Sequence, residues 1–327
     1  MGAIGQPNLR ARQEQRVGNG ADWRSETRAR LCYRRGVSTD APADLIAIDV
    51  GNSRVKLGRF RAPGDCVASA QSRALPIAAP VLPEPDETLA ATAEELESGA
   101  LAGWLDRLAV DGMDSRVKFC LASVRPSCDA LVERLLRDWF GQRNQDVSLE
   151  RLVSERMPID LRVAAPARVG ADRVAAAVAA NRLRREGTPA IVVDLGTAIT
   201  VDLVSADGAF EGGAILPGPA LAARALAEET EGLPLAPLDE LEIAPEAVGD
   251  ATEPALEAGL FWGAVGAIRE LIARQSDRLT NPPQVFLTGG AAPSVARLIG
   301  GPDYTVRHVP HLTLAGIALS AAQDKRS

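Results

Sequence analysis

The chain has 327 residues, of which 46% are hydrophobic and 24% charged, and its formal net charge at pH 7 is −7. This composition is ordinary for a globular protein of one or two domains. The acidic balance argues against nucleic acid as the main partner, because a surface that follows phosphates needs an excess of basic side chains. No apolar run reaches the roughly 20 residues that span a bilayer, so we expect no membrane partner. The four cysteines form no C-x-x-C pair, which argues against a zinc site or a disulfide framework. This use of cysteine fits a reducing cytoplasm.

Residues 1–43 differ from the rest of the chain. They hold eight arginines against four acids and lack the apolar core of a signal peptide. A transit peptide is an alternative, although the four acids count against it. We expect a disordered leader or an upstream start site, with no chemistry in either case.

From residue 44 onward, strand-like and helical patterns alternate. The expected elements, in chain order, are strands 45–50 and 54–57, a Pro-rich acidic loop 76–87, helix 92–108, strand 117–124, helix 130–140, an alanine-rich helix 172–185, strands 190–195 and 199–203, helix 254–274, strand 284–287 and helix 312–322. This order predicts a two-domain α/β protein with helices on mixed sheets. The predicted domains are 44–187 and 188–327, with a linker near 186–189.

Two of the predicted hairpins share the same local sequence pattern, 145 positions apart. Each has an apolar run rich in β-branched residues, then Asp-x-Gly-[Asn/Thr], then a second strand-like run; the two acids are Asp49 and Asp194. Glycine at such a turn allows close approach of another backbone or a ligand. An acid at the end of a buried strand is costly unless a cation offsets it. The repeat therefore predicts two similar halves that face each other and hold a metal and phosphate between them.

Other chemistries lack their motifs. The chain has no G-x-x-x-x-G-K-[ST] and no G-x-G-x-x-G after a strand, so Walker-type and dinucleotide sites are not expected. The two histidines, His308 and His311, lie together near the C-terminus with no second cluster to support them. A Ser-His-Asp or Cys-His arrangement therefore has little basis.

Six segments taken together resemble one family. In chain order they are Asp49-Val50-Gly51-Asn52-Ser53, Ala122-Ser123-Val124-Arg125-Pro126, Val169-Gly170-Ala171-Asp172-Arg173, Asp194-Leu195-Gly196-Thr197-Ala198-Ile199-Thr200, Glu211-Gly212-Gly213-Ala214-Ile215-Leu216-Pro217-Gly218 and Leu287-Thr288-Gly289-Gly290. The set, over roughly residues 44–320, resembles type III pantothenate kinase of the actin/hexokinase/Hsp70-like superfamily. The resemblance implies two ribonuclease-H-like (actin-like ATPase) domains and ATP-dependent phosphorylation of pantothenate to 4′-phosphopantothenate, the first step of coenzyme A biosynthesis. It also implies a cytoplasmic homodimer that uses Mg²⁺ and K⁺ or NH₄⁺.

The same resemblance assigns roles to individual residues. It implies that ATP is bound by Asp49, Val50, Gly51, Asn52, Ser53, Arg54, Val55, Lys56 and Thr197. It implies that pantothenate is bound by Gly170, Ala171, Asp172, Arg173 and Thr252, and that Asp172 is the catalytic proton acceptor. Asp194 would hold the monovalent cation, and Asp49 would hold Mg²⁺ through water.

The residues themselves allow these roles. Glycine turns bring backbone N–H groups close to phosphate oxygens, and Arg173 can grip a carboxylate or a phosphate. The dipole of the predicted helix that begins at Asp172 favours the ionised carboxylate, whereas burial favours the neutral acid. The alternative for Asp172 is a helix-capping or first-turn acid with no catalytic role. Asp202, which alternates with Val201 and Leu203, is interpreted as a strand residue rather than a base.

The chain departs from the family pattern at Ser53, Val163 and Ala165, and in the segment 230–234. The departures in the segment before Asp172 bear on substrate affinity rather than on ATP chemistry. Two alternatives remain open: a non-catalytic transcriptional accessory relative, or another enzyme of the superfamily, such as a phosphatase or a sugar or other small-molecule kinase.

Overall fold

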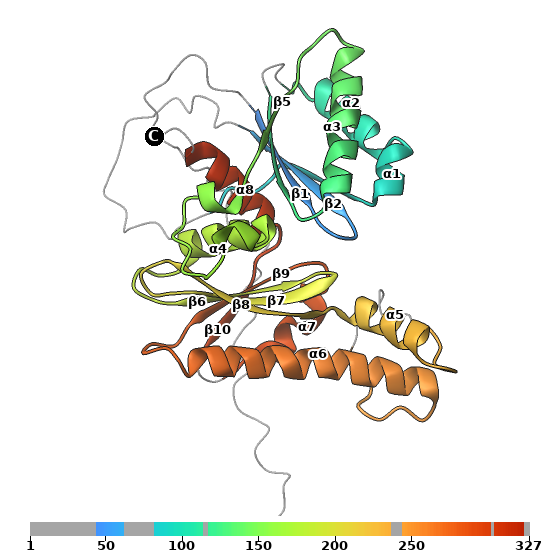
Figure 1. Ribbon diagram of the computed structural model, residues 1–327, viewed down its shortest axis with the longest axis vertical. Coiled ribbons are helices and arrows are strands. Elements are labelled where there is room, and N and C mark those ends of the chain that lie inside the picture. The colour runs from blue at the N-terminus through green and yellow to red at the C-terminus, as the bar shows by residue number, and fades with distance from the viewer. Residues whose placement is uncertain (1–43, 62–81, 114–116, 237–243, 302–303, 324–327) are drawn as a thin grey trace, which may run out of the picture.

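The computed structural model describes residues 44–61, 82–113, 117–236, 244–301 and 304–323 (Figure 1). The predicted leader and the first half of the Pro-rich loop 76–87 lie outside these residues. None of the helices in the described part of the chain is long and apolar enough to cross a membrane.

Two five-stranded sheets form the framework. The first contains β1 (Asp44–Val50), β2 (Val55–Arg61), β3 (Glu87–Ala91), β4 (Lys118–Ser123) and β5 (Ser148–Arg151). The second contains β6 (Ala190–Leu195), β7 (Ala198–Val204), β8 (Phe210–Pro217), β9 (Gln284–Thr288) and β10 (Thr305–His308). Their strand orders are β3-β2-β1-β4-β5 and β10-β9-β6-β7-β8.

The two sheets have the same topology. In each, the first three strands in sequence pair antiparallel, the fourth pairs with the first in parallel, and the fifth pairs with the fourth in parallel. This is the arrangement expected for a ribonuclease-H-like domain, so the predicted pair of mixed sheets flanked by helices is confirmed. Strands β1–β5 lie within residues 44–187 and β6–β10 within 188–327. The exact division at residue 187 stays a prediction.

Helices cover both faces of each sheet (Figure 1). One face of the first sheet packs on α1 (Ala93–Glu97), α2 (Ala100–Val110) and α3 (Pro126–Gly141). The outer face of the second sheet packs on α6 (Thr252–Ser276) and α7 (Ala292–Ile299), and α5 (Pro219–Glu229) lies beside α6. Two further helices, α4 (Ala171–Leu183) and α8 (Leu312–Gln323), lie between the sheets and join them through shared apolar clusters.

The contact between α4 and α8 depends on small side chains. Nine of the thirteen residues of α4 are buried, and six of those nine are alanine. A Cβ built on Gly316 of α8 would overlap the carbonyl oxygen of Ala175. The two helices therefore approach closely only because position 316 is glycine.

Gly316→Ala is expected to destabilise the protein by roughly 1–3 kcal/mol or more, because overpacking against backbone forces the helices apart. Gly103→Ala is the matched control, since Gly103 lies in α2 and a Cβ added there would have nothing within 4 Å. That variant should gain up to about 1 kcal/mol of stability, because alanine has a higher helix propensity than glycine. Urea unfolding of both variants measures the difference, and equal effects would show that the two helices can separate without loss.

One predicted helix was wrong. Residues 92–108 form two helices, because α1 ends at Glu97 with Ser98 as its C-cap, and Gly99 adopts a positive φ of 103° before α2 begins. The patterns also missed β3, β5, β8, α5, α7 and β10, most of which are short or lie at sheet edges.

Candidate active site

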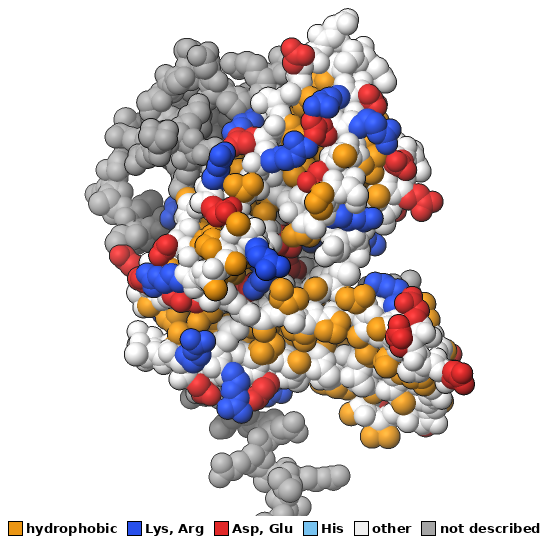
Figure 2. Space-filling model, viewed as in Figure 1, with side chains coloured by type: hydrophobic (Ala, Val, Ile, Leu, Met, Phe, Trp, Pro, Cys, Tyr) orange, Lys and Arg blue, Asp and Glu red, His pale blue; other side chains and the backbone are white. Residues whose placement is uncertain are grey.

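The two Asp-x-Gly turns meet in the folded chain. In the first, Gly51 N–H donates to the Arg54 carbonyl at 3.1 Å; in the second, Gly196 N–H donates to the Ala198 carbonyl at 3.2 Å. The Thr197 hydroxyl donates to the Ser53 hydroxyl oxygen at 2.8 Å, which links the turns directly. They lie where Figure 2 shows the surface notched between the two sheet units of Figure 1.

Glycines elsewhere in the chain make room for the second turn. A Cβ on Gly289, whose φ is +96°, would lie 2.5 Å from the Leu195 carbonyl and 2.6 Å from Asp194 Oδ1. A Cβ on Gly218 would overlap the Gly196 carbonyl oxygen. Gly289 of the Leu-Thr-Gly-Gly segment and Gly218 of the Pro-Gly segment are thus explained by close backbone packing around Asp194 and Thr197.

Three carboxylates and one lysine share this region. Asp49 is the penultimate residue of β1 and is 5% exposed, and Asp194 is the penultimate residue of β6. Asp172 is in the first turn of α4. Lys56 Nζ lies 3.8 Å from Asp49 Oδ2. The charge of Asp172 raises the pKa of both other acids, while Lys56 lowers the pKa of each, so the four groups interact electrostatically.

Burial controls the charge of the acids. Loss of solvation is the largest cause in each case: it raises the pKa of Asp49 to about 7 and moves the pKa values of Asp172 and Asp194 upward. At Asp172 the desolvation outweighs the hydrogen bond from the Arg173 N–H and the charge of Arg173. The competition between helix dipole and burial that the sequence left open is therefore decided by burial.

These shifts predict a pH dependence of stability. Between about pH 4 and 7 an unfolded Asp49 ionises while the folded one keeps its proton, so the metal-free protein loses stability as the pH rises through this window. Asp49→Asn removes that loss. The variant should gain stability over the wild type on going from pH 4.5 to 8, by on the order of 1.4 kcal/mol for each unit of pKa shift. Denaturant unfolding at several pH values measures this, and parallel curves for the two proteins would contradict it.

The acids fit a cation. Asp194 Oδ1 is buried without a hydrogen-bond partner in the described structure, and an unpaired buried carboxylate oxygen is costly unless a cation offsets it. Within the same described residues, no group of three or more His, Cys, Asp or Glu side chains is arranged to hold a metal. A site with so few carboxylates suits Mg²⁺, because this ion keeps several waters and takes one or two carboxylates together with substrate phosphates.

Comparison with known proteins identifies the family. The model of the type III pantothenate kinase family matches residues 45–274. The chain belongs to the type III pantothenate kinase family. It is 36% identical to the type III pantothenate kinase of Acidiphilium cryptum (strain JF-5) over 226 residues, which is 67% of this chain and 78% of that protein. It is 31% identical to the enzyme of Endomicrobium trichonymphae over 84% of this chain and 97% of that protein.

Solved structures resemble the chain more remotely. A putative 2-dehydro-3-deoxygalactonokinase from Sinorhizobium meliloti has a TM-score of 0.47 and 12% sequence identity, over 86% of this chain and all of that one. A likeness at this level carries no weight for the function, and the strand orders of the two sheets define the fold.

The Gly-Ala-Asp-Arg segment of this family member contains an ion pair that the sequence did not reveal. Arg173 Nε lies 3.1 Å from each carboxylate oxygen of Asp202, and Arg173 Nη2 donates to Asp202 Oδ1. Asp202 is a residue of β7, as expected, and is 1% exposed. Its partner is 29 positions away on another element, so no local spacing pointed to the pair.

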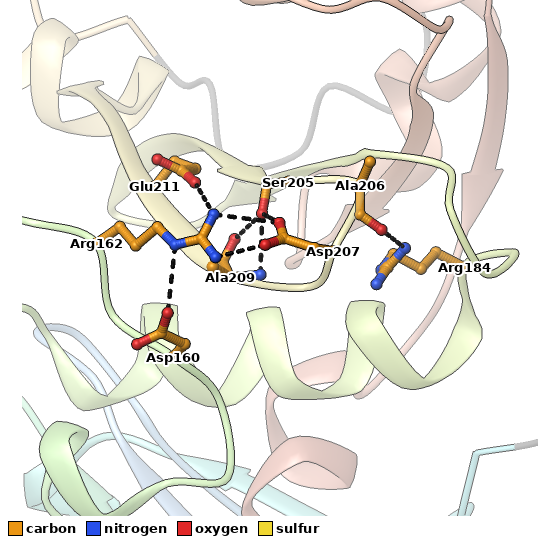
Figure 3. A network of polar contacts seen from close by, with 8 residues as sticks. All are labelled: Asp160, Arg162, Arg184, Ser205, Ala206, Asp207, Ala209 and Glu211. Carbon is orange, nitrogen blue, oxygen red and sulfur yellow. Dashed lines mark hydrogen bonds and ion pairs between the residues drawn. The ribbon is translucent and has the colours of Figure 1, made fainter.

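The segment that leads into α4 is fixed to the second sheet (Figure 3). Arg162 pairs with Asp160 at 3.2 Å, with Glu211 at 3.2 Å and with Asp207 on the β7–β8 turn. The buried Ser154 hydroxyl donates to the Val169 carbonyl at 2.7 Å. These contacts hold the chain immediately before Gly170, in the same region as the atypical Val163 and Ala165.

Other expected ATP-binding residues fall into two groups. Val50 and Val55 are cross-strand partners buried in the first sheet, so they support the turn rather than face a ligand. Asn52, Ser53 and Arg54 are exposed. The Asn52 carbonyl accepts a hydrogen bond from Arg125 Nη1 at 3.0 Å, which ties the first turn to the start of α3. Arg125 belongs to one of the six family segments, but nothing in its local sequence predicts this contact.

Thr252 lies apart from the other expected substrate-binding residues. It begins α6 and lines an open groove of about 470 Å³ together with Leu233, residues 249–251 and residues 255–256. In Figure 1 this end of α6 lies next to α5 and away from α4. Within one chain, the fold does not bring Thr252 to Asp172, whereas Gly170 and the buried Ala171 directly adjoin it.

Proposed function

We propose that this chain transfers the γ-phosphoryl group of ATP to the primary hydroxyl of pantothenate, giving 4′-phosphopantothenate and ADP. The observation that carries the proposal is the meeting of the two Asp-x-Gly turns, joined by the Ser53–Thr197 hydrogen bond, with Asp172 interacting electrostatically with Asp49 and Asp194. Membership of the family supplies the acceptor.

In this proposal Asp172 is the general base. As the new bond forms between the pantothenate oxygen and the γ-phosphorus, the bond from that phosphorus to the β–γ bridging oxygen breaks, and the hydroxyl proton moves to Asp172. A raised pKa makes a carboxylate a better proton acceptor near neutral pH. The Arg173 N–H donates to Asp172 Oδ1 at 2.8 Å and fixes the carboxylate at the start of α4.

The turns would bind the polyphosphate. Backbone N–H groups near Gly51 and Gly196, with the hydroxyls of Ser53 and Thr197 and the ammonium of Lys56, supply donors and positive charge to phosphate oxygens. Asp49 would hold Mg²⁺ through water, and when bound Mg²⁺ neutralises charge on the phosphate oxygens. Asp194 would hold K⁺ or NH₄⁺. Positioning of this kind carries most of phosphoryl-transfer catalysis.

Product analysis tests the function. Purified protein with ATP, Mg²⁺ and K⁺ is offered pantothenate, hexoses, glycerol or no acceptor, and mass spectrometry identifies the product. We expect 4′-phosphopantothenate alone. A phosphorylated sugar or glycerol would favour another kinase of the superfamily, and no consumption of ATP with any acceptor would favour a non-catalytic relative.

We also propose that the enzyme is a cytoplasmic homodimer. Thr252 is remote from Asp172 within one chain, so a second copy would have to bring it to the pantothenate site. Figure 2 shows hydrophobic side chains spread over the part of the surface formed by β8, α5 and α6. Exposed apolar residues of this region are Ile215, Leu221, Leu235 and Val248, and a patch of this kind is typical of an interface.

Light scattering should give twice the chain mass of 34.4 kDa. Leu221→Glu, on α5, should shift the protein toward monomer and raise the KM for pantothenate, because the site would lose the partner's Thr252. Val110→Glu is the control, since Val110 is 87% exposed at the end of α2 on the other unit. A stable, fully active monomer of the unaltered protein would refute the dimer.

A further inference from the structure

We propose that Asp202 is a positioning residue that gives the enzyme its selectivity for an acceptor with a carboxylate, by orienting the guanidinium of Arg173. The inference rests on the proposed function and concerns the pantothenate site. It assigns a role to a buried acid that the phosphoryl-transfer chemistry itself does not use.

Asp202 occupies a space that the second sheet leaves for it. Its register partner on β8 is Gly213, and a Cβ on Gly213 would overlap Asp202 Oδ1. The same Cβ would also overlap the Val201 carbonyl oxygen, so the second glycine of the Glu-Gly-Gly segment makes room for both the β7 backbone and the carboxylate. Asp202 is 1% exposed and both of its oxygens contact Arg173, so its carboxylate is held in a buried ion pair with that residue.

The ion pair uses only one edge of the guanidinium. Arginine carries five N–H donors in a planar fork, and the bonds to Asp202 come from Nε and Nη2. The structure gives Nη1 no hydrogen-bond partner among the described residues. The other edge, formed by Nη1 and the second hydrogen of Nη2, matches a carboxylate in the bidentate geometry that arginine favours. Arg173 therefore holds Asp202 with one edge and has the second available for an anionic substrate.

Asp202 also keeps Arg173 apart from the base. Arg173 directly follows Asp172, and the two charges interact. With Asp202 removed, the guanidinium would be left with the charge of the Asp172 carboxylate. Such a pair would occupy the edge meant for the substrate. The side chain of Arg173 is 15% exposed, so it reaches the site while its position is fixed by a buried partner.

The test compares two acceptors, pantothenate and pantothenol, in which an alcohol replaces the carboxylate. The measured quantity is the ratio of kcat/KM for pantothenate to that for pantothenol; where pantothenol reacts too slowly, its inhibition constant is used instead. Asp202→Asn should lower this ratio by at least about tenfold, which corresponds to about 1.4 kcal/mol of lost discrimination. In an Arg173→Gln background, Asp202→Asn should have no further effect on the ratio.

Asp44→Asn is the matched control. Asp44 Oδ2 accepts two buried hydrogen bonds on the first sheet, from Arg59 Nε at 3.1 Å and from Arg59 Nη2 at 2.7 Å. Asp44 begins β1, so it lies at the other end of this strand from Asp49. This variant should lose stability as Asp202→Asn does, yet keep the ratio. If Asp202→Asn does not fold, Asp202→Glu retains the charge and should lower the ratio by displacing the guanidinium.

The outcomes separate the two proposals. An unaltered enzyme that phosphorylates neither acceptor would overturn the proposed function. An enzyme that phosphorylates pantothenate, with an unchanged ratio in the folded Asp202 variants, would overturn only the positioning role. A purely structural Asp202 would lower kcat/KM for both acceptors alike.

Discussion

Asp172→Asn is expected to lower kcat by at least about 10²-fold while the KM for ATP changes little, because general-base catalysis is typically worth roughly 10² to 10⁴ in rate. The substitution keeps the size of the side chain and removes the charge that accepts the proton. The upper end of the range is tempered by the loose transition state of phosphoryl transfer, in which positioning supplies much of the acceleration. Steady-state kinetics with each substrate varied in turn measures the effect.

The control for Asp172 is a first-turn acid of another helix. Asp129 occupies the first turn of α3, outside the cluster of acids. If Asp172 merely stabilised its helix through the dipole, the two Asp→Asn variants would behave alike and lose stability rather than kcat. A near-normal kcat for Asp172→Asn, with a loss for Asp202→Asn, would mean that the base had been assigned to the wrong acid. The ion pair of Asp202 with Arg173 argues against that outcome.

The central parts of the fold were predictable because each sheet has a strongly apolar centre. Strands β1, β6 and β9 are nearly continuous runs of buried residues, and long helices such as α6 carry a clear helical period. Edge strands lack this signal: β5 and β10 have no fully buried residue. Likewise, the residues of α1 and α2 share one apolar pattern, and only the left-handed backbone at Gly99 separates them.

The site was predictable in its local parts and not in its long-range ones. The repeated Asp-x-Gly pattern led directly to two turns that meet through Ser53 and Thr197. The Arg173–Asp202 pair, the Arg125 contact to Asn52 and the distance of Thr252 from α4 depend on how separate elements pack. A single sequence contains no local record of such packing.

Asp194→Asn should abolish most of the response to monovalent cations, and the comparison with Asp49→Asn makes this test sharp. The two acids occupy equivalent positions at the ends of β1 and β6, so the same substitution is made in the same backbone setting. Wild-type turnover should require K⁺ or NH₄⁺, and Asp194→Asn should lower turnover in K⁺ by at least about 10²-fold toward the level in Na⁺, since electrostatic stabilisation of this kind is often worth roughly 10²–10³.

The physical reason lies in the unpaired oxygen of Asp194. Its Oδ1 is buried without a partner in the described structure, and the neutral amide of asparagine cannot attract a cation to that place. Asp49 instead has Lys56 at 3.8 Å, so Asp49→Asn should raise the Mg²⁺ concentration needed for activity while the ratio of turnover in K⁺ to that in Na⁺ stays high. Kinetics over crossed series of Mg²⁺ and K⁺ concentrations separates the two effects. Equal turnover of the unaltered enzyme in sodium and potassium buffers would contradict the role of Asp194 in binding a monovalent cation. Mg²⁺ would then be the ion that binds near its buried oxygen.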